Sequence, residues 1–87
     1  VECAYYLRMR AVDQPGVLAD VTRILGELRI SIEAILQQEP NAGDATVPIV
    51  LLTHRVVEAS VDKALAGISK LPDIEGVITR IRMESFI

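Results

Sequence analysis

The stretch that decides the fold is residues 4–28, which read AYYLRMRAVDQPGVLADVTRILGEL. Residues 4–11 alternate between apolar and polar side chains with a period of two, and this pattern predicts a half-buried strand. Residues 13–16 then predict a turn, because proline lacks a backbone donor and glycine relieves backbone crowding. From Val17 onward the apolar residues recur at helical spacing, which predicts an amphipathic helix.

The rest of the chain repeats this order. Residues 30–38 are rich in isoleucine and predict a second strand, and a turn cluster at 39–44 leads into a third strand at 47–54. Residues 58–71 carry apolar side chains at helical spacing and predict a second helix. Residues 77–84 alternate again and predict the last strand.

This order of elements predicts an α+β fold, a ferredoxin-like βαββαβ sandwich with a four-stranded antiparallel sheet and two helices on one face. Right-handed crossovers place the first and third strands in the middle of such a sheet. The third strand is apolar on both sides, as a central strand should be. The second strand then lies at an edge, where unpaired backbone groups invite a partner.

The chain has 87 residues, which we interpret as one domain spanning residues 1–87. A domain of this size buries only about two thirds of its unfolded surface, so its stability margin is thin and a second copy would increase it. Val1 leads directly into a strand, and we expect the chain to be a fragment of a longer polypeptide.

Charge and composition argue against several classes of partner. The net charge is −3, the nine Lys and Arg residues form no cluster, and only 3% of residues are aromatic. A nucleic-acid interface needs a basic face and stacking side chains, and an acidic lipid surface needs the basic face too, so we expect neither partner. The longest apolar run, 47–52, is far shorter than the ~20 residues that cross a bilayer. With Cys3 as the single cysteine no intrachain disulfide can form, and we expect a cytoplasmic protein.

Side chains suited to catalysis are scattered along the sequence. The single histidine, His54, stands at the end of a predicted strand with no carboxylate beside it in sequence, and Cys3 is best interpreted as a small hydrophobe. The acidic residues are spread over different elements, and no glycine-rich phosphate loop is present. We therefore predict no catalytic residue, no metal site and no catalysis by this chain alone.

The junction between the first strand and the first helix offers the one candidate binding site. A helix start exposes unpaired N–H groups with a partial positive charge, and Gly16 lets a ligand approach them closely. A carboxylate would bind the amides of residues 16–18, and Asp13 would accept hydrogen bonds from an ammonium group. An α-amino acid carries both groups. In the alternative interpretation, which the spacing alone favours, Asp13 caps the helix and Pro15 and Gly16 only shape the turn.

The chain resembles the ACT domain family over nearly its whole length. The hallmark of that family is a turn of the form D/N-x-P-G-V-L between the first strand and helix, which residues 13–18 match as DQPGVL. The second strand, ISIEAILQQ at 30–38, is similar to a strand at the carboxyl end of bacterial homoserine dehydrogenases. The segment VITRIR at 77–82 also suits the last strand of those enzymes.

The resemblance implies a regulatory domain of such an enzyme, which stands on the pathway to threonine and methionine. ACT domains pair side by side through the second strand and first helix, so a homodimer or higher oligomer is implied, with an amino acid, threonine favoured, bound at the interface. No cofactor is implied in this domain, whereas NAD(P) is expected in a catalytic domain elsewhere. The residues that match the family's binding positions are Asp13, Gln14, Gly16, Val17, Leu18 and Ala19, with Ser31 and Ile32 of the neighbouring copy.

Two positions depart from the serine-binding relatives of this family. Those relatives carry a histidine where this chain has Ala11, and an asparagine where it has Ser31. Fewer polar side chains than in those relatives would then contact the ammonium and carboxylate groups of a bound amino acid. Three interpretations stay open: an amino-acid sensor, a module that only dimerises, and a small enzyme of ferredoxin-like fold, the last being disfavoured by the scarcity of acid–base residues.

Overall fold

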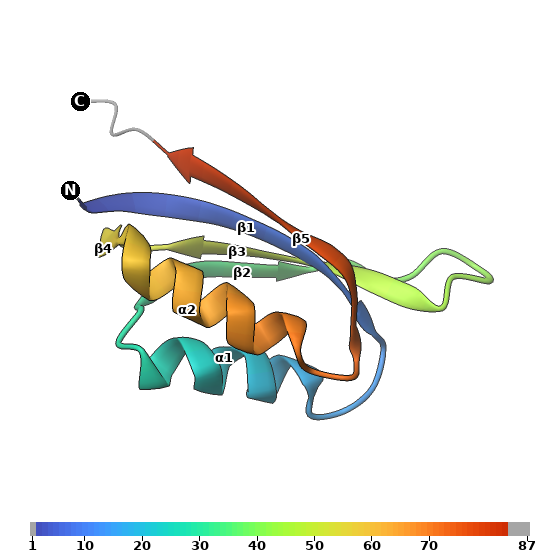
Figure 1. Cartoon of the computed structure of the whole chain (residues 1–87). Helices are drawn as coiled ribbons and strands as arrows, with labels where there is room; N and C mark the ends of the chain where they lie inside the picture. Colours follow the sequence, from blue (N-terminus) through green and yellow to red (C-terminus); the bar gives the residue numbers. More distant parts are fainter. Residues whose placement is uncertain (1, 84–87) are drawn as a thin grey trace.

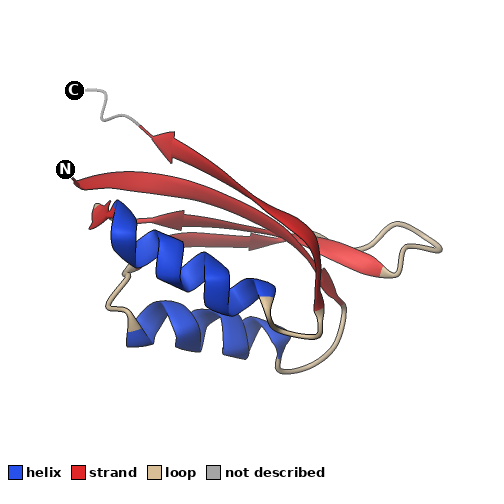
Figure 2. Cartoon of the chain, viewed as in Figure 1, coloured by secondary structure: helices blue, strands red, loops and turns tan. Residues whose placement is uncertain are grey.

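The computed structural model describes residues 2–83, and these residues form five strands and two helices. They form two layers, a sheet and a pair of helices that cover one of its faces (Figures 1 and 2). In chain order they are β1 (Glu2–Val12), α1 (Val17–Glu27), β2 (Ile32–Gln37), β3 (Thr46–Thr53), β4 (Val56–Val57), α2 (Glu58–Ser69) and β5 (Ile74–Met83).

The sheet is antiparallel throughout the described residues and has β1 and β3 at its centre. β1 pairs with β3 and with β5, and β2 pairs with β3, so β2 and β5 are the edge strands. The predicted ferredoxin-like order, with the first and third strands in the middle and the second at an edge, is confirmed. The short strand β4 is an addition to that prediction, and it pairs with Glu2 and Cys3 of β1.

A local interruption separates β4 from β3. The backbone N–H of Tyr5 donates to the side-chain oxygen Oγ1 of Thr53 at 3.0 Å, and Thr53 is the one buried polar residue of the described chain. The hydroxyl thus satisfies a backbone donor that would otherwise be buried without a partner. Pairing with β1 resumes at Val56, two residues past His54.

The core lies between the helices and the face of the sheet that they cover. The alternation predicted for β1 is confirmed, since Tyr5, Leu7, Met9 and Ala11 are at most 2% exposed. The predicted helical stripes are also found, because each helix buries three residues spaced three or four apart. These residues are Val17, Val21 and Leu25 of α1 and Val61, Ala64 and Ile68 of α2.

No helix of the described residues covers the other face of the sheet, and we call it the open face (Figure 1). Its members follow from the strand alternation and from the pairing register. They are Glu2, Ala4, Tyr6, Arg8, Arg10 and Val12 of β1, Thr46, Pro48, Val50 and Leu52 of β3, Ala34 and Leu36 of β2, Val57 of β4, and Glu75, Thr79, Ile81 and Met83 of β5.

The second strand begins later than predicted, and its pairing with β3 is irregular. It begins at Ile32 rather than at residue 30, because the N–H of Ile30 donates to the C=O of Leu25 and closes the end of α1. Its register also shifts between Ile32 and Ala34. Ile32 therefore lies opposite buried Thr53 on the helix side, whereas Ala34 lies on the open face, although a regular strand would put both on one face.

The last strand and the end of the second helix also differ from the prediction. β5 begins at Ile74, three residues early, and runs through Gly76, whose φ is +74°. α1 ends at Glu27, α2 ends at Ser69 rather than at residue 71, and the predicted strand residue 84 lies outside the described residues.

Candidate functional site

The turn from β1 into α1 is built around Gly16. Its φ of +93° lies in the left-handed region, which a residue with a Cβ adopts only with strain, and no heavy atom lies within 4 Å of where that Cβ would stand. The N–H of Gln14 donates to the C=O of Val12 at 2.9 Å, and the N–H of Val12 donates to the C=O of Asp73 at 2.8 Å. These bonds fix the start of the turn, while residues 13–16 are exposed.

The start of α1 keeps its backbone donors free of any side-chain cap. Gly16 is the N-cap residue, and no side chain of the described residues bonds to the helix start. The first bond within the helix runs from the N–H of Asp20 to the C=O of Gly16 at 3.0 Å. The N–H groups of Val17, Leu18 and Ala19 precede it and point out of the helix end, where an anion is favoured.

The interpretation of Asp13 as a helix cap was therefore wrong. The cap position belongs to Gly16, three residues later, and Asp13 makes no capping hydrogen bond. Its side chain is exposed beside the helix start. A carboxylate in this place is free to accept hydrogen bonds from a ligand.

The second part of the predicted site, Ser31 and Ile32, lies at the opposite end of α1. Ser31 is exposed and its C=O accepts the N–H of His54 at 2.9 Å, while Ile32 packs against the core. The 11 residues of α1 span about 16 Å at 1.5 Å per residue. A single chain therefore does not bring the two parts together, and the contribution of Ser31 and Ile32 from a neighbouring copy stays a prediction.

The topology determines which ends of α1 and β2 lie at the same end of the molecule. β1 and β2 are both antiparallel to β3, so they run in the same direction, and α1 runs back between them. Gly16 is consequently at the same end of the molecule as Gln37, the last residue of β2. If two copies of β2 paired antiparallel, the partner's Ile32 would come to this end.

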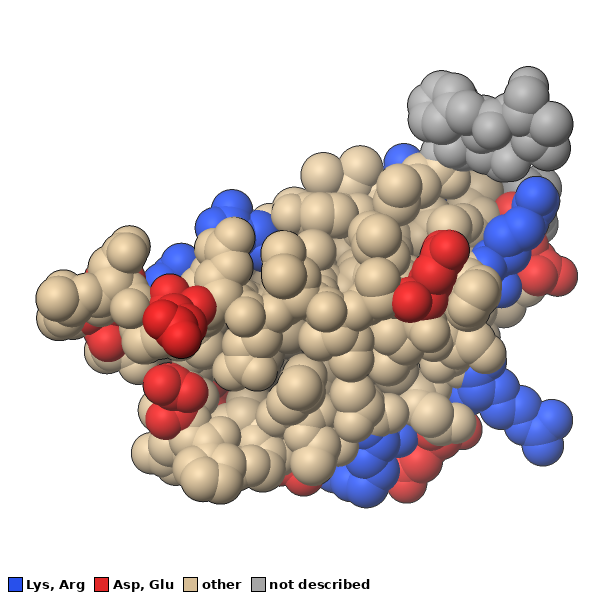
Figure 3. Space-filling view, turned by 180° about the vertical axis from the view of Figure 1, so that it is seen from behind, with Lys and Arg blue, Asp and Glu red and all other residues tan. Residues whose placement is uncertain are grey.

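The surface beside β2 has few charges. β2 and β3 are distant in Figure 1 and therefore near the reader in Figure 3, where the charged side chains lie mainly at the margins of a largely uncharged surface. Within β2, Ile35 is 41% exposed and Leu36 is 56% exposed. An edge strand with exposed apolar side chains and unpaired backbone groups is suited to pairing with another strand.

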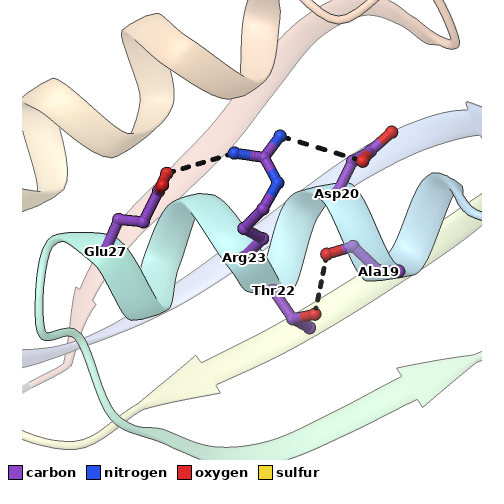
Figure 4. A network of polar contacts seen from close by, with 5 residues as sticks. All are labelled: Ala19, Asp20, Thr22, Arg23 and Glu27. Atoms are coloured by element: carbon purple, nitrogen blue, oxygen red, sulfur yellow. Dashed lines mark hydrogen bonds and ion pairs between the residues drawn. The ribbon is translucent and has the colours of Figure 1, made fainter.

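The polar side chains of α1 form ion pairs and hydrogen bonds with other groups of the same helix. Arg23 donates to Glu27 at 3.1 Å and lies 3.8 Å from Asp20, and Thr22 bonds to the C=O of Ala19 on the other side of the helix (Figure 4). All three charged side chains are more than half exposed, so the pairs contribute little to stability. None of these contacts occupies the N–H groups at the helix start.

The described residues offer no assembled catalytic or metal site. No group of three His, Cys, Asp or Glu residues within 2–83 is placed to hold a metal ion. His54 is exposed at the end of β3, and Cys3 is half-buried in β1. No helix within the same range is long and apolar enough to cross a membrane.

Two shallow hollows lie beside β5, away from the turn. One, of about 380 Å³, lies between α2 and β5, and the other, of about 210 Å³, lies between β1 and β5. Val77 borders both and is 93% exposed. Neither hollow includes a residue of the predicted effector site.

Sequence reasoning missed two features of the surface. Arg80 of β5 pairs with Asp62 of α2, and Arg82 pairs with Glu58 at 3.6 Å, which ties the edge strand to the helix layer. The alternation of arginines with apolar residues in residues 80–83 was the available signal, because it puts the two arginines on the helix side and Ile81 and Met83 on the open face.

Comparison with known proteins identifies the family. The model of the ACT domain matches residues 5–73. A homoserine dehydrogenase of Methylobacillus glycogenes is 57% identical over 84 residues, which cover 97% of this chain and 20% of that protein. A homoserine dehydrogenase of Pseudomonas aeruginosa is 48% identical over 83 residues, which cover 95% of this chain and 19% of that protein. The chain thus spans about one fifth of the length of these relatives.

Solved structures agree with this similarity. The crystal structure of a homoserine dehydrogenase from Thiobacillus denitrificans superimposes with a TM-score of 0.85 at 49% identity, over 97% of this chain and 18% of that one. The regulatory subunit of an aspartate kinase from Thermus thermophilus superimposes with a TM-score of 0.66 at 22% identity, over 93% of this chain and 51% of that one. At this lower identity the likeness concerns the fold alone.

Proposed function

Because the chain belongs to the ACT domain family, we propose that it is the amino-acid-binding and dimerisation domain of a homoserine dehydrogenase, and that threonine is its effector. The observation that carries this proposal is the uncapped start of α1 after a left-handed Gly16, with exposed Asp13 beside it. The N–H groups of residues 17–19 would donate hydrogen bonds to the carboxylate of the amino acid, and the carboxylate of Asp13 would accept hydrogen bonds from its ammonium group. Gln14 lies in the same exposed turn.

A second copy completes the site in this proposal. Two β2 strands would pair antiparallel at their free edges and make one continuous sheet, as in other cases where a strand is added to a sheet edge. Such pairing would bring the partner's Ser31 and Ile32 towards the helix start at Gly16. The effector would then contact both copies and favour the orientation in which they are paired.

Such a domain regulates by binding one orientation of the pair more tightly than another. A ligand shifts this equilibrium only by its difference in affinity between the two states, typically 1–3 kcal/mol, or about 5–150-fold. The change would pass to a catalytic part that lies outside this chain. The NAD(P) of that reaction would bind there, and this domain would contribute no group to the chemistry.

The test is a two-dimensional amide NMR titration of the domain with threonine and then with other amino acids. We expect saturable shifts at residues 16–19 and at Ser31 and Ile32, and a weaker affinity after Asp13→Ala with the fold unchanged. Asp44→Ala removes an exposed carboxylate from the β2–β3 loop and is the matched control, for which the affinity should stay the same. An unchanged affinity in Asp13→Ala would remove Asp13 from the site.

A second candidate is a module that only dimerises. It is favoured by Ala11, which is fully buried and offers no polar group to a ligand, and by the exposed apolar side chains of β2. This candidate predicts no shifts at millimolar amino acid while the domain remains self-associated. The titration therefore separates the two functions.

A further inference from the structure

The end of α1 carries an arginine at a position where glycine is the usual residue. Arg29 has a φ of +59°, and among the described residues it is the one residue with a Cβ at positive φ. The N–H of Ile30 donates to the C=O of Leu25 at 2.9 Å, and the N–H of Arg29 donates to the C=O of Gly26 at 3.0 Å. These two bonds form a Schellman motif, in which glycine usually takes the left-handed position. Backbone strain of this kind points to a function of the side chain.

No contact within the described chain offsets this strain. Arg29 is exposed, and none of the ion pairs or side-chain hydrogen bonds of residues 2–83 includes it. An arginine keeps its charge at all ordinary pH values and presents several donors to a carboxylate. The guanidinium is therefore available to an acid outside the chain.

An unpaired acid lies at the other end of β2. Glu39 follows the strand by two residues, is exposed, and is in none of the ion pairs of residues 2–83. Pro40 comes directly after it, and the residue before a proline favours extended backbone, so the direction of β2 continues to Glu39. Arg29 precedes the same strand by three residues. The edge strand thus has a cation before it and an anion after it.

From this polarity we propose that Arg29 forms an ion pair with Glu39 of a second copy, and that two such pairs fix the antiparallel register of the β2 strands. This ion pair depends on the β2 edge pairing of the proposed function. It adds to that pairing a named contact at each end of the joined strands, outside the backbone hydrogen bonds.

The register of β2 brings the two side chains within reach of each other. The strand has one extra residue at the shift after Ile32. A twofold axis at Ile35 therefore puts Ile30 level with the partner's Glu39, and Arg29 is the next residue. At about 3.3 Å per residue and about 4.8 Å between strands, the Cα atoms of Arg29 and Glu39 lie about 6 Å apart. Two long side chains can bridge this distance.

The charges along β2 disfavour a parallel pairing. In an in-register parallel pair, Arg29, Glu33 and Glu39 would each lie beside the same residue of the partner, and like charges repel. In the antiparallel pair about Ile35, Glu33 comes level with the partner's uncharged Gln37 and is farther from Glu39 than Arg29 is. The edge is thus complementary to itself in the antiparallel orientation.

The acids near Arg29 have cations of their own chain beside them. Glu27 accepts a hydrogen bond from Arg23 at 3.1 Å. Arg55 donates to the backbone C=O of Glu2 at 3.1 Å, so its charge lies beside that residue. Neither acid is therefore a competitor for the Arg29 guanidinium.

The opposite end of β2 is acidic. Asp13 and Asp44 are exposed and flank the pair formed by Val12 and Thr46, so they lie at the same end as Glu39. Arg10, the cation of β1 at this end, donates both of its side-chain hydrogen bonds to Thr46. A guanidinium arriving from a second copy therefore meets charges of the opposite sign.

The test is a charge swap, measured by sedimentation equilibrium at several protein concentrations. Arg29→Glu or Glu39→Arg alone should weaken dimerisation about tenfold, and the double variant should restore it. Lys63→Glu makes the same change of charge as Arg29→Glu at an exposed position of α2, and it should leave dimerisation unchanged.

Arg29→Gly separates the contact from the fold. Glycine removes the strain at this position, so the urea midpoint of unfolding should rise when it is measured in the Ile35→Lys background, in which dimerisation is weakened. The same substitution in the otherwise unmodified chain should weaken dimerisation about threefold. A residue with only a structural role would not move these two measurements in opposite directions.

The outcomes distinguish this ion pair from the edge pairing on which it depends. If Ile35→Lys weakens the dimer and Arg29→Glu does not, the edges pair without this contact and the ion pair alone is contradicted. A double variant that associates no better than the single variants has the same meaning. A chain that is monomeric at millimolar concentration without any substitution contradicts the edge pairing itself, and the ion pair with it.

Discussion

The two edge strands of the sheet, β2 and β5, present different surfaces to a partner. β2 has six residues with exposed, uncharged side chains at its middle, and none of the ion pairs of the described residues involves it. β5 has ten residues, and its Arg80 and Arg82 pair with acidic side chains of α2. Its register with β1 also shifts between Arg8 and Arg10.

The difference indicates which edge is open to another chain. Natural sheets protect their edges with charged side chains and with bulges that twist the strand away from a partner. β5 carries both devices along its length, whereas β2 has its one charged side chain, Glu33, at the irregularity near its first residue, and Ala34 to Gln37 are in regular pairing. The structure thus favours β2 over β5 as the edge that accepts a second copy.

The largest expected effect tests this contrast at Ile35. Ile35 lies opposite buried Leu51 and is 41% exposed at the middle of β2, so a twofold axis through that strand brings its two copies close together. Ile35→Lys would place two like charges there and bury them partly. We expect edge dimerisation to weaken about 100-fold, equal to about 2.7 kcal/mol, in sedimentation equilibrium.

Val77→Lys is the matched control on the other edge. Val77 is 93% exposed on β5, so the same type of substitution changes an edge that we expect to be unpaired. Association should remain that of the unmodified chain. An equal loss in both variants would mean that the two edges do not differ in the way proposed.

The second effect concerns the irregularity that protects β5. Gly76 has a φ of +74° with no heavy atom within 4 Å of a Cβ built on it, so a substitution there costs backbone strain and not crowding. Left-handed backbone costs about 1–2 kcal/mol for an ordinary residue and more for a β-branched one. Gly76→Val should therefore lower the free energy of unfolding by about 2 kcal/mol in urea denaturation.

Gly26→Ala gives the opposite sign in the same assay. Gly26 is inside α1, also without a heavy atom within 4 Å, and its conformation is helical. Alanine is favoured there by up to ~1 kcal/mol, so the free energy of unfolding should rise. If Gly76→Val were as stable as the unmodified chain, the irregular part of β5 would not require a residue with positive φ at position 76.

The strand order of the fold could be predicted because it depends on periodicity and handedness. The alternation in residues 4–11 and the helical stripe from Val17 fix which side chains face the core, and right-handed crossovers then leave one order of strands. Shifts of register could not be predicted in this way. The shift after Ile32 changes the face on which that side chain lies, and the residue types alone do not show it.

The turn of the candidate site could be predicted only in part. The need for Gly16 followed from turn chemistry, and its φ of +93° confirms it. The choice between capping and ligand binding for Asp13 depended on which residue takes the cap position, and spacing favoured the wrong answer. The other half of the proposed site belongs to a second copy, and a single sequence contains no direct sign of that arrangement.

The smallest effect tests how firmly β5 is tied to α2. The hydrogen bond to Asp62 raises the pKa of Arg80 above its ordinary value, so Arg80 keeps its charge, and its share of the stability, until strongly alkaline pH. The side chains are 32% and 56% exposed, which limits the pair to about 0.5 kcal/mol. A double-mutant cycle with Arg80→Met and Asp62→Asn should give this coupling at low salt and less at 1 M salt. A coupling near zero at both salt concentrations would leave the bulge at Gly76 as the main protection of this edge.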